Sequence, residues 1–266
     1  MRVYGRSAPR SEASSTMKVK FLGAHNAEAG SVKLPGVLVD STLALDAGSL
    51  SSLSVTAQLN LRAIILTHQH YDHLRDLPVI GMNLFLSNAS VAVYGLTEVR
   101  SILAEHLLSG SLYPQFLDRG TLDYRSVLPG EPFQIGEHHI LPLLMEHSVP
   151  TMGFEVSSGN RRLFYSGDTG PNLSNVWMHT QPDLIVIEVT ASNRWTDFGR
   201  EAGHLTPALL REELANFKKL KGYVPPVFTV HMNPFQEDDI RTELAEAART
   251  LNSPITPAHE GLEIEI

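Results

Sequence analysis

Residues 67–73 read Thr-His-Gln-His-Tyr-Asp-His, and four side chains in this short segment can bind metal ions. The segment directly follows an apolar run that is typical of a β-strand. In an extended chain His68 and His70 point the same way, because side chains alternate between the two faces. A turn after them lets Asp72 and His73 face a second point nearby. Packing alone does not explain such a cluster, since buried polar groups need partners, so the segment predicts a strand end that serves two metal ions.

Three further candidate ligands each follow an apolar, strand-like run later in the chain: His147, Asp168 and His231. Ligands at the ends of separate strands can converge on one rim of a fold. A lone histidine after a strand is more often packed or solvated than bound to metal. These three residues therefore support a site only in combination with the segment 67–73.

The composition restricts the chemistry of that site. The chain has 266 residues, no cysteine and 12 histidines, so thiolate ligands, disulfides and a cysteine nucleophile are excluded. Its hydrophobic content of 42% is that of a folded globular chain. No apolar run approaches the roughly 20 residues that span a bilayer. We therefore expect a cytoplasmic protein with no membrane partner, in which imidazole and carboxylate groups hold the metal.

The formal net charge of −8 argues against an extended nucleic-acid surface, which needs clustered lysine and arginine. We interpret the basic cluster at Lys218, Lys219 and Lys221 as a solvated helix end. Bound divalent metals would make the site locally positive, so a small anionic substrate fits this charge. The sequence leaves a homo-oligomer open.

The N-terminal residues 1–16 differ from the rest of the chain. They lack an apolar period and the apolar core of a secretory signal, and we interpret them as a disordered extension or an upstream start. A transit peptide is the weaker alternative, because Glu12 opposes it. A strand-like run opens at Met17, and we expect one domain over residues 17–266.

Short strands and helices alternate after Met17 in two comparable halves. This pattern predicts an α/β fold with two sheets packed face to face and helices outside. The expected strands are 17–23, a hairpin of 36–40 and 42–46, and 62–66, 91–94, 139–145, 153–156, 162–166, 184–189, 227–231 and 262–266. The expected helices are 52–60, 74–86, 98–108, 207–220 and 237–251.

The order of motifs resembles the metallo-β-lactamase superfamily. The chain carries His-x-His-x-Asp-His, an isolated histidine, an aspartate within Ser-Gly-Asp-Thr and a final histidine, from about Met17 to the C-terminus. The resemblance implies a four-layer αβ/βα sandwich with the site at one edge between the sheets. It also implies a first metal held by His68, His70 and His147, a second held by Asp72, His73 and His231, and Asp168 bridging them. Zinc suits this ligand set, while manganese and iron remain open.

Two later motifs resemble the phosphodiesterase branches of that superfamily. Glu188 lies in Ile-Glu-Val-Thr-Ala and His204 in Gly-His-Leu-Thr-Pro. In the tRNA 3′-processing nuclease family and its relatives acting on cyclic or small phosphodiesters, the late histidine donates a proton and the acidic residue orients it. The stretch Ala-His-Glu-Gly-Leu at 258–262 also resembles the nuclease ending. The plainer alternative is that Glu188 finishes a strand and that His204 caps the following helix.

Other features depart from those families. The nuclease family carries a long Gly-rich arm that grips tRNA between its third and fourth metal motifs. Here His147 and Asp168 are about two dozen residues apart, which leaves room for a strand pair only. Residues 231–234 resemble class II cyclic-nucleotide phosphodiesterases, but Tyr71 stands where those enzymes have leucine. We therefore expect a small or cyclic substrate rather than tRNA.

The resemblance implies a reaction. Two metals sharing a water lower its pKa, so hydroxide is available near neutrality. Asp72 and Asp168 orient this hydroxide for attack on phosphorus, His204 protonates the departing oxygen, and Glu188 fixes its tautomer. The alternative is a lactonase or related carboxylic-ester hydrolase, which needs no acid at position 204. A third option, a non-catalytic metal-holding protein, fits the full ligand set poorly.

The remaining histidines receive plainer interpretations. We expect His138 and His139 in a hairpin turn, and His106 and His179 on the surface. His25 is a candidate for the rim of the site.

Overall fold

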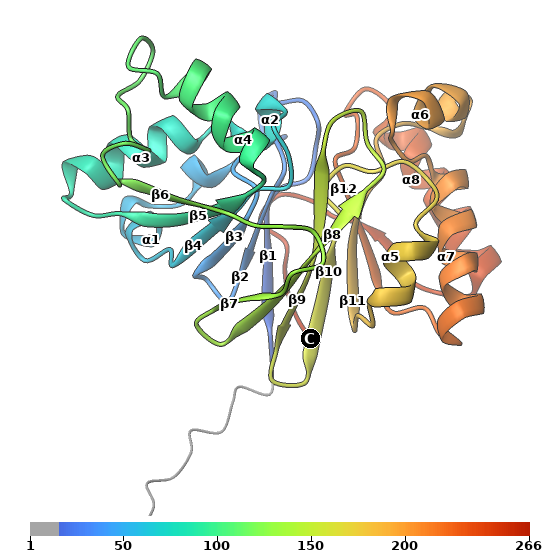
Figure 1. The fold of residues 1–266 in the computed structure, drawn as a ribbon. Helices are drawn as coiled ribbons and strands as arrows, with labels where there is room; N and C mark the ends of the chain where they lie inside the picture. The colour runs from blue at the N-terminus through green and yellow to red at the C-terminus, as the bar shows by residue number, and fades with distance from the viewer. Residues whose placement is uncertain (1–15) are drawn as a thin grey trace, which may run out of the picture.

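Residues 16–266 are described by the computed structural model, in which two seven-stranded sheets pack face to face between layers of helices (Figure 1). In spatial order the first sheet contains β14 (Glu263–Glu265), β1 (Lys18–Gly23), β2 (Gly36–Val39), β3 (Leu43–Leu45), β4 (Ala63–Ile65), β5 (Val91–Gly95) and β6 (Leu122–Ser126). The second contains β13 (Ile255–Pro257), β12 (Val227–Val230), β11 (Leu184–Glu188), β10 (Arg161–Tyr165), β9 (Thr151–Ser158), β8 (His138–Met145) and β7 (Phe133–Ile135).

The helices form the outer layers. Figure 1 places α3 and α4 against the first sheet, and α5, α7 and α8 against the second. The α-helices are α1 (Val55–Leu59), α2 (Tyr71–Leu74), α3 (Leu77–Leu86), α4 (Thr97–Ile102), α5 (Ser174–His179), α6 (Thr196–Ala202), α7 (Pro207–Lys221) and α8 (Glu237–Leu251). Three shorter helical segments are η1 (Leu50–Ser52), η2 (Leu103–Leu107) and η3 (Asn193–Trp195). The four layers confirm the predicted αβ/βα sandwich.

Both sheets contain a parallel half that determines where the site lies. Strands β3 to β6 run parallel in the first sheet, and β10 to β13 run parallel in the second. The register pairs Tyr165 with Val186 and Glu188 with Val230, so neighbouring strands end nearly level. Side chains that follow these carboxyl ends therefore gather at one edge of the sandwich.

The spacing of apolar residues determines which face of a helix packs against its sheet. Helix α8 buries Ile240, Leu244, Ala247 and Leu251, which recur with the period of one helical face and pack in the cluster beneath the second sheet. Trp177 of α5 is fully buried in the same cluster. Burial of such apolar area contributes about 25 cal/mol for each Å² and holds the layers together.

Local capping signals fix the start of α7. Thr206 accepts a hydrogen bond from the amide of Leu209, and Pro207 takes the first helical position, where no amide donor is needed. Helix α7 therefore begins three residues after His204 and is capped by Thr206, so the alternative in which His204 caps this helix is wrong.

Most predicted elements are present, with shorter or shifted ends. The expected helix 52–60 is present as the shorter α1, because the Ser54 side chain accepts a hydrogen bond from the Ala57 amide and so begins the helix at Val55. The expected helix 74–86 begins only at Leu77, where Pro78 occupies the first turn. The expected helix 98–108 is α4 followed by the π-helical segment η2. The sequence interpretation missed the short elements β6, β7, β13, α5 and α6.

The predicted turn at His138 and His139 is wrong. These residues open β8, and the turn consists of Gly136 and Glu137, because glycine readily adopts the φ of 59° found at position 136. His138 is buried and its Nε2 lies 2.8 Å from Asp40 Oδ2. His106 and His179 are exposed, as expected.

The domain start is visible from Met17 onward. Met17 is buried and exchanges backbone hydrogen bonds with Ile266, which joins the two ends of the described chain. The expected extension lies, apart from Thr16, outside the described residues. No helix within residues 16–266 combines the length and apolar character that a membrane span requires.

Candidate metal centre

The predicted ligands come from loops that follow strands of both sheets. The loop after β4 leads into the histidine-rich segment, and α2 turns Asp72 and His73 toward the same centre. The loops after β8, β10 and β12 bring in the other three ligands. The residues that gather there are His68, His70, Asp72, His73, His147, Asp168 and His231.

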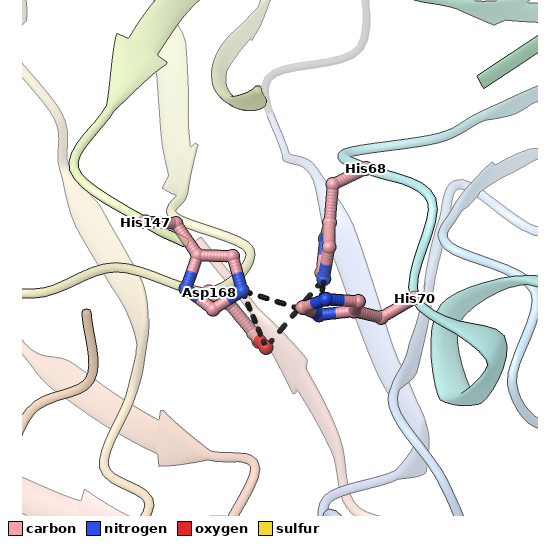
Figure 2. Close-up of side chains that lie close together, drawn as sticks. All are labelled: His68, His70, His147 and Asp168. Atoms are coloured by element: carbon pink, nitrogen blue, oxygen red, sulfur yellow. Dashed lines mark hydrogen bonds and ion pairs between the residues drawn. The ribbon is translucent and has the colours of Figure 1, made fainter. Parts of the chain in front are cut away.

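Four of these residues form a first cluster (Figure 2). Nε2 of His68 lies 3.0 Å from Nδ1 of His70, and Nε2 of His147 lies 3.2 Å from the same atom. Oδ2 of Asp168 is 3.7 Å from His68 Nε2 and 3.8 Å from His147 Nε2. Three imidazoles and one carboxylate thus face one point, a donor set that suits a divalent transition metal.

The second cluster shares Asp168 with the first. Nε2 of His231 lies 3.1 Å from Asp72 Oδ2 and 3.4 Å from Asp168 Oδ2. Nε2 of His73 lies 3.2 Å from Asp168 Oδ1 and 3.6 Å from Asp72 Oδ2. Because Asp168 directs its carboxylate at both groups, it is placed to bridge two ions.

Buried atoms without partners show that the cluster fits cations. Among the described residues, His73 Nε2 and Asp168 Oδ1 are buried, and apart from their 3.2 Å ion-pair contact with each other neither atom has a hydrogen-bond partner. Leaving such atoms unpaired in the interior costs about 1–3 kcal/mol each. Two divalent ions would supply the missing partners of both atoms.

In the first cluster, the outer nitrogens of the His147 and His68 rings are held by neighbouring oxygens. The His147 Nδ1–H donates to the Gly203 carbonyl at 2.9 Å, and the His68 Nδ1–H donates to Thr67 Oγ1 at 2.9 Å. This arrangement fixes the tautomer, so that each Nε2 presents a lone pair to the centre.

Asp46 organises the second cluster from behind, and the sequence interpretation did not identify it. Its Oδ2 accepts from His73 Nδ1 at 2.7 Å and from the Tyr165 hydroxyl at 2.7 Å, and its Oδ1 accepts from the Thr67 amide at 2.8 Å. Asp46 holds a left-handed φ of 61°, an uncommon conformation for a residue other than glycine. In the sequence, its position directly after β3 and before Ala-Gly is the one feature that could have marked Asp46 as a site residue.

Thr190 was also missed, and it connects the metal ligands to the proposed proton donor. Its hydroxyl donates to Glu188 Oε2 at 2.8 Å and accepts from His231 Nδ1 at 2.7 Å. A single hydroxyl therefore orients one ligand ring and one carboxylate. The Glu-x-Thr spacing brings both residues to the end of β11.

Glu188 and His204 form a buried pair beside the cluster. Oε1 of Glu188 lies 2.7 Å from His204 Nδ1, and the carboxylate also accepts from the amides of Thr169 and Leu205. The His204 ring stacks on that of His231 with centroids 5.4 Å apart. Burial opposes the charged imidazole, but the Glu188 carboxylate raises the pKa of His204 to about 9. His204 therefore carries a proton near neutral pH.

A family model described as beta-lactamase superfamily domain matches residues 37–232. This match covers most of the chain and includes every residue named in both clusters. The chain belongs to the metallo-β-lactamase superfamily of hydrolases.

Curated relatives of this superfamily member are similar over parts of their length. Ribonuclease Z of Methanopyrus kandleri is 29% identical over 132 residues, which are 47% of this chain and 44% of the relative. The cGMP-dependent 3′,5′-cGMP phosphodiesterase A of Dictyostelium discoideum is 32% identical over 134 residues, 50% of this chain and 15% of the relative. The chain thus spans less than half the length of either protein.

Solved structures show the same superfamily fold over nearly the whole chain. The metallo-beta-lactamase fold protein YhfI from Bacillus subtilis superposes with a TM-score of 0.78 at 21% identity, covering 95% of this chain and 100% of that one. Unliganded yeast PDE1 superposes with a TM-score of 0.81 at 15% identity, covering 94% and 99%.

In this metallo-β-lactamase superfamily site, the charge states of His68 and Asp168 suit a cation, and the carboxylates attract positive charge. Burial, followed by the charge of His73, lowers the pKa of His68 well below its usual range. Burial opposes ionisation of Asp168, yet His231 and His73 hold the pKa of that carboxyl well below normal. Burial likewise opposes charge on His73, but Asp168 and Asp46 raise its pKa well above normal. Neutral His68 and ionised Asp168 are the forms that bind metal, and the same carboxylates favour positive charge at His73.

All nine sequence-predicted site residues lie together. His25 is buried next to this region: its Nδ1 lies 2.8 Å from Glu260 Oε1, and its backbone pairs with Met232, directly after a predicted ligand. His231 itself holds a φ of 64°, a conformation that turns its ring back toward the cluster at the end of β12.

Proposed function

We propose that this hydrolase is a phosphodiesterase that acts on a small or cyclic phosphodiester. The observation that carries the proposal is the 2.7 Å contact between His204 Nδ1 and Glu188 Oε1, which holds the His204 ring beside the proposed metal ligands. Phosphodiester cleavage releases a basic alkoxide, and a positioned proton donor lowers the barrier to that step.

We propose the nine predicted residues as the working site and zinc as the preferred metal. His68, His70 and His147 would hold one ion, and His73 and His231 would contribute to the other. Asp72 would complete the second set of ligands, and Asp168 would belong to both sets. Two such ions would supply hydroxide near neutral pH and neutralise charge that develops on the phosphoryl oxygens.

The chain's own groups then divide the remaining work. Glu188 accepts the His204 Nδ1–H, so the proton at Nε2 is the one available to the leaving oxygen. The buried carboxylate also favours the imidazolium form, which keeps this proton in place until the bond breaks. Thr190 and the amides of Thr169 and Leu205 hold the carboxylate still.

Size and charge support a small substrate. Only the hairpin of β9 and β10 separates His147 from Asp168, so no extended arm lies between these two positions. The net charge of −8 disfavours a long polyanion. The named activities of the relatives, a ribonuclease and a cyclic-nucleotide phosphodiesterase, are both phosphodiester chemistry.

The test is a substrate comparison on one metal-loaded sample. An aryl phosphodiester, a homoserine lactone and a β-lactam are offered at equal concentration with added zinc or manganese. We expect the phosphodiester to have the highest kcat/KM. Faster turnover of the lactone would replace the proposal with the ester-hydrolase alternative.

A further inference from the structure

A cavity of about 400 Å³ is lined by His204 together with Thr190, which holds the ring of His231. Its volume falls in the range of small-molecule sites, roughly 300–1,000 Å³. Three segments frame it: the region of η3 and α6, the loop that follows His231, and the loop that follows β1. Two of these segments also carry proposed site residues, so a ligand in the cavity would be continuous with one at the metals.

The apolar wall of the cavity consists of Trp195 and Phe198. Trp195 is 46% exposed and Phe198 is 53% exposed. A ligand that covered these large aromatic rings would remove apolar surface from water, which is favourable. The rings meet edge to face, with centroids 6.3 Å apart and an interplanar angle of 77°. A flat ligand ring can therefore stack on one of them and meet the other at its edge.

The polar wall offers amide groups with a fixed orientation. Gln236 Oε1 accepts from the backbone amide and the hydroxyl of Ser192, and Asn233 Oδ1 accepts from the Phe235 amide. Each oxygen is thus engaged, which leaves the two NH₂ groups as donors for a ligand. A third amide, on Asn26, completes this wall. Among the described residues, His204 at one end of the cavity is the only ionisable side chain in its lining, so the part between the aromatic wall and the amides suits an uncharged group.

We infer that this cavity binds the nucleobase of a nucleoside phosphodiester whose leaving oxygen is protonated by His204. A nucleobase is flat, uncharged and edged with carbonyl and ring-nitrogen acceptors, which matches the aromatic wall and the amide donors. Because His204 lines the cavity, the nucleoside lies on the leaving-group side of the phosphorus. This inference rests on the proposed phosphodiesterase function and adds the class of substrate.

The test compares two substrates that share one leaving oxygen. Guanosine 3′,5′-cyclic monophosphate is the nucleoside substrate, and methyl ribofuranoside 3,5-cyclic phosphate is the same ring system without a base. Base–aromatic stacking predicts a preference in kcat/KM of roughly 10- to 100-fold for the nucleoside. Trp195→Ala and Phe198→Ala should reduce this ratio, mainly by raising KM for the nucleoside substrate.

Phe235→Ala is the matched control. Phe235 is 91% exposed in the same surface region but does not line the cavity. Its replacement should preserve the preference. An equal loss in this variant would assign the effect to a general aromatic surface and overturn the cavity as the base site.

The outcomes separate the two proposals. If the enzyme hydrolyses neither cyclic phosphate nor any aryl phosphodiester, the proposed function fails. If it hydrolyses both cyclic substrates equally well, the phosphodiesterase function stands and the nucleobase site is refuted.

Binding gives an independent measurement. The chain has two tryptophans, of which Trp177 is fully buried, so a ligand-dependent change in emission reports on Trp195. Guanosine 5′-monophosphate should quench this emission, while ribose 5-phosphate should not. The quenching should disappear in Trp195→Phe. Equal quenching by both phosphates, or quenching that survives the substitution, contradicts stacking on Trp195.

Discussion

Removal of the His204 imidazole tests the proposed chemistry most directly. His204→Ala deletes the ring whose Nδ1 lies 2.7 Å from Glu188 Oε1, and His204 is outside the predicted set of metal ligands. A ribose alkoxide needs a proton as the bond to phosphorus breaks, whereas a nitrophenolate is stable as an anion. The variant should therefore slow a nucleoside cyclic phosphate by roughly 10²–10⁴-fold, the usual contribution of a positioned acid, and barely affect a nitrophenyl diester.

The structure indicates how strongly Glu188 favours the protonated form of His204. Its carboxylate raises the pKa of His204 from 6.5 to about 9, against the opposing effect of burial. That difference corresponds to about 3 kcal/mol in favour of the imidazolium. Glu188→Gln keeps the shape of the side chain but removes its charge. It should therefore cost on the order of 10²-fold on the same alkoxide-releasing substrate, and less on the aryl substrate.

The assay measures initial rates on both substrates, together with the metal content of each variant. Metal content should remain that of the parent enzyme, because His204 lies outside the predicted ligand set. Equal slowing of both substrates would indicate a role in binding or structure. Loss of metal would make His204 a ligand, and parental rates on both substrates would refute the proton-donor role and remove the main support for the phosphodiesterase.

Further predictions concern the metals, the domain start and stability. Metal analysis should find close to two ions per chain, and Asp168→Ala should lose at least one, because its carboxylate faces both clusters at 3.2–3.8 Å; full occupancy with intact activity would contradict the bridging assignment. A chain beginning at Met17 should melt at the same temperature and turn over substrate as the full chain does, whereas a large drop in Tm would show that the preceding residues pack on the domain. Glu260 has a pKa of about 2, since His25 and the Lys33 amide outweigh the effect of burial, so its ionisation stabilises the fold above the unfolded pKa near 4.5, and this contribution is lost as the pH falls toward 2. The Tm difference between Glu260→Gln and the parent should accordingly be largest above about pH 5 and shrink toward pH 2, and a difference independent of pH would argue against this ionisation.

The sequence predicted most of the ligand set because the chemistry is concentrated locally. The four ligands of residues 67–73 are adjacent in the chain: alternation in an extended segment points His68 and His70 the same way, and the turn after them directs Asp72 and His73 to a second point. Apolar runs before His147, Asp168 and His231 marked three more strand ends. The order of these motifs identified the superfamily, and the family match and the two packed sheets confirm that identification.

The sequence was less informative wherever short elements depend on their neighbours. Strands such as β7 and β13 have three residues each and no period that distinguishes them from loops. His138 was assigned to a turn, but it pairs with Ile135 of β7 as a strand residue, and its ring contacts Asp40, 98 positions away. Tertiary contacts of this kind override local preference.

What the sequence alone determined is the set of reactive residues: imidazoles and carboxylates at strand ends, without cysteine, in an order that specifies the superfamily. Only the tertiary structure revealed the groups that orient them. Asp46 meets Tyr165 across 119 positions, and Thr190 joins His231 to Glu188 through a single hydroxyl. The cavity at Trp195 likewise exists only where three distant segments meet. A ligand needs only the right atom type, which is written in the sequence, whereas the direction of its lone pair depends on hydrogen bonds that folding alone brings within reach.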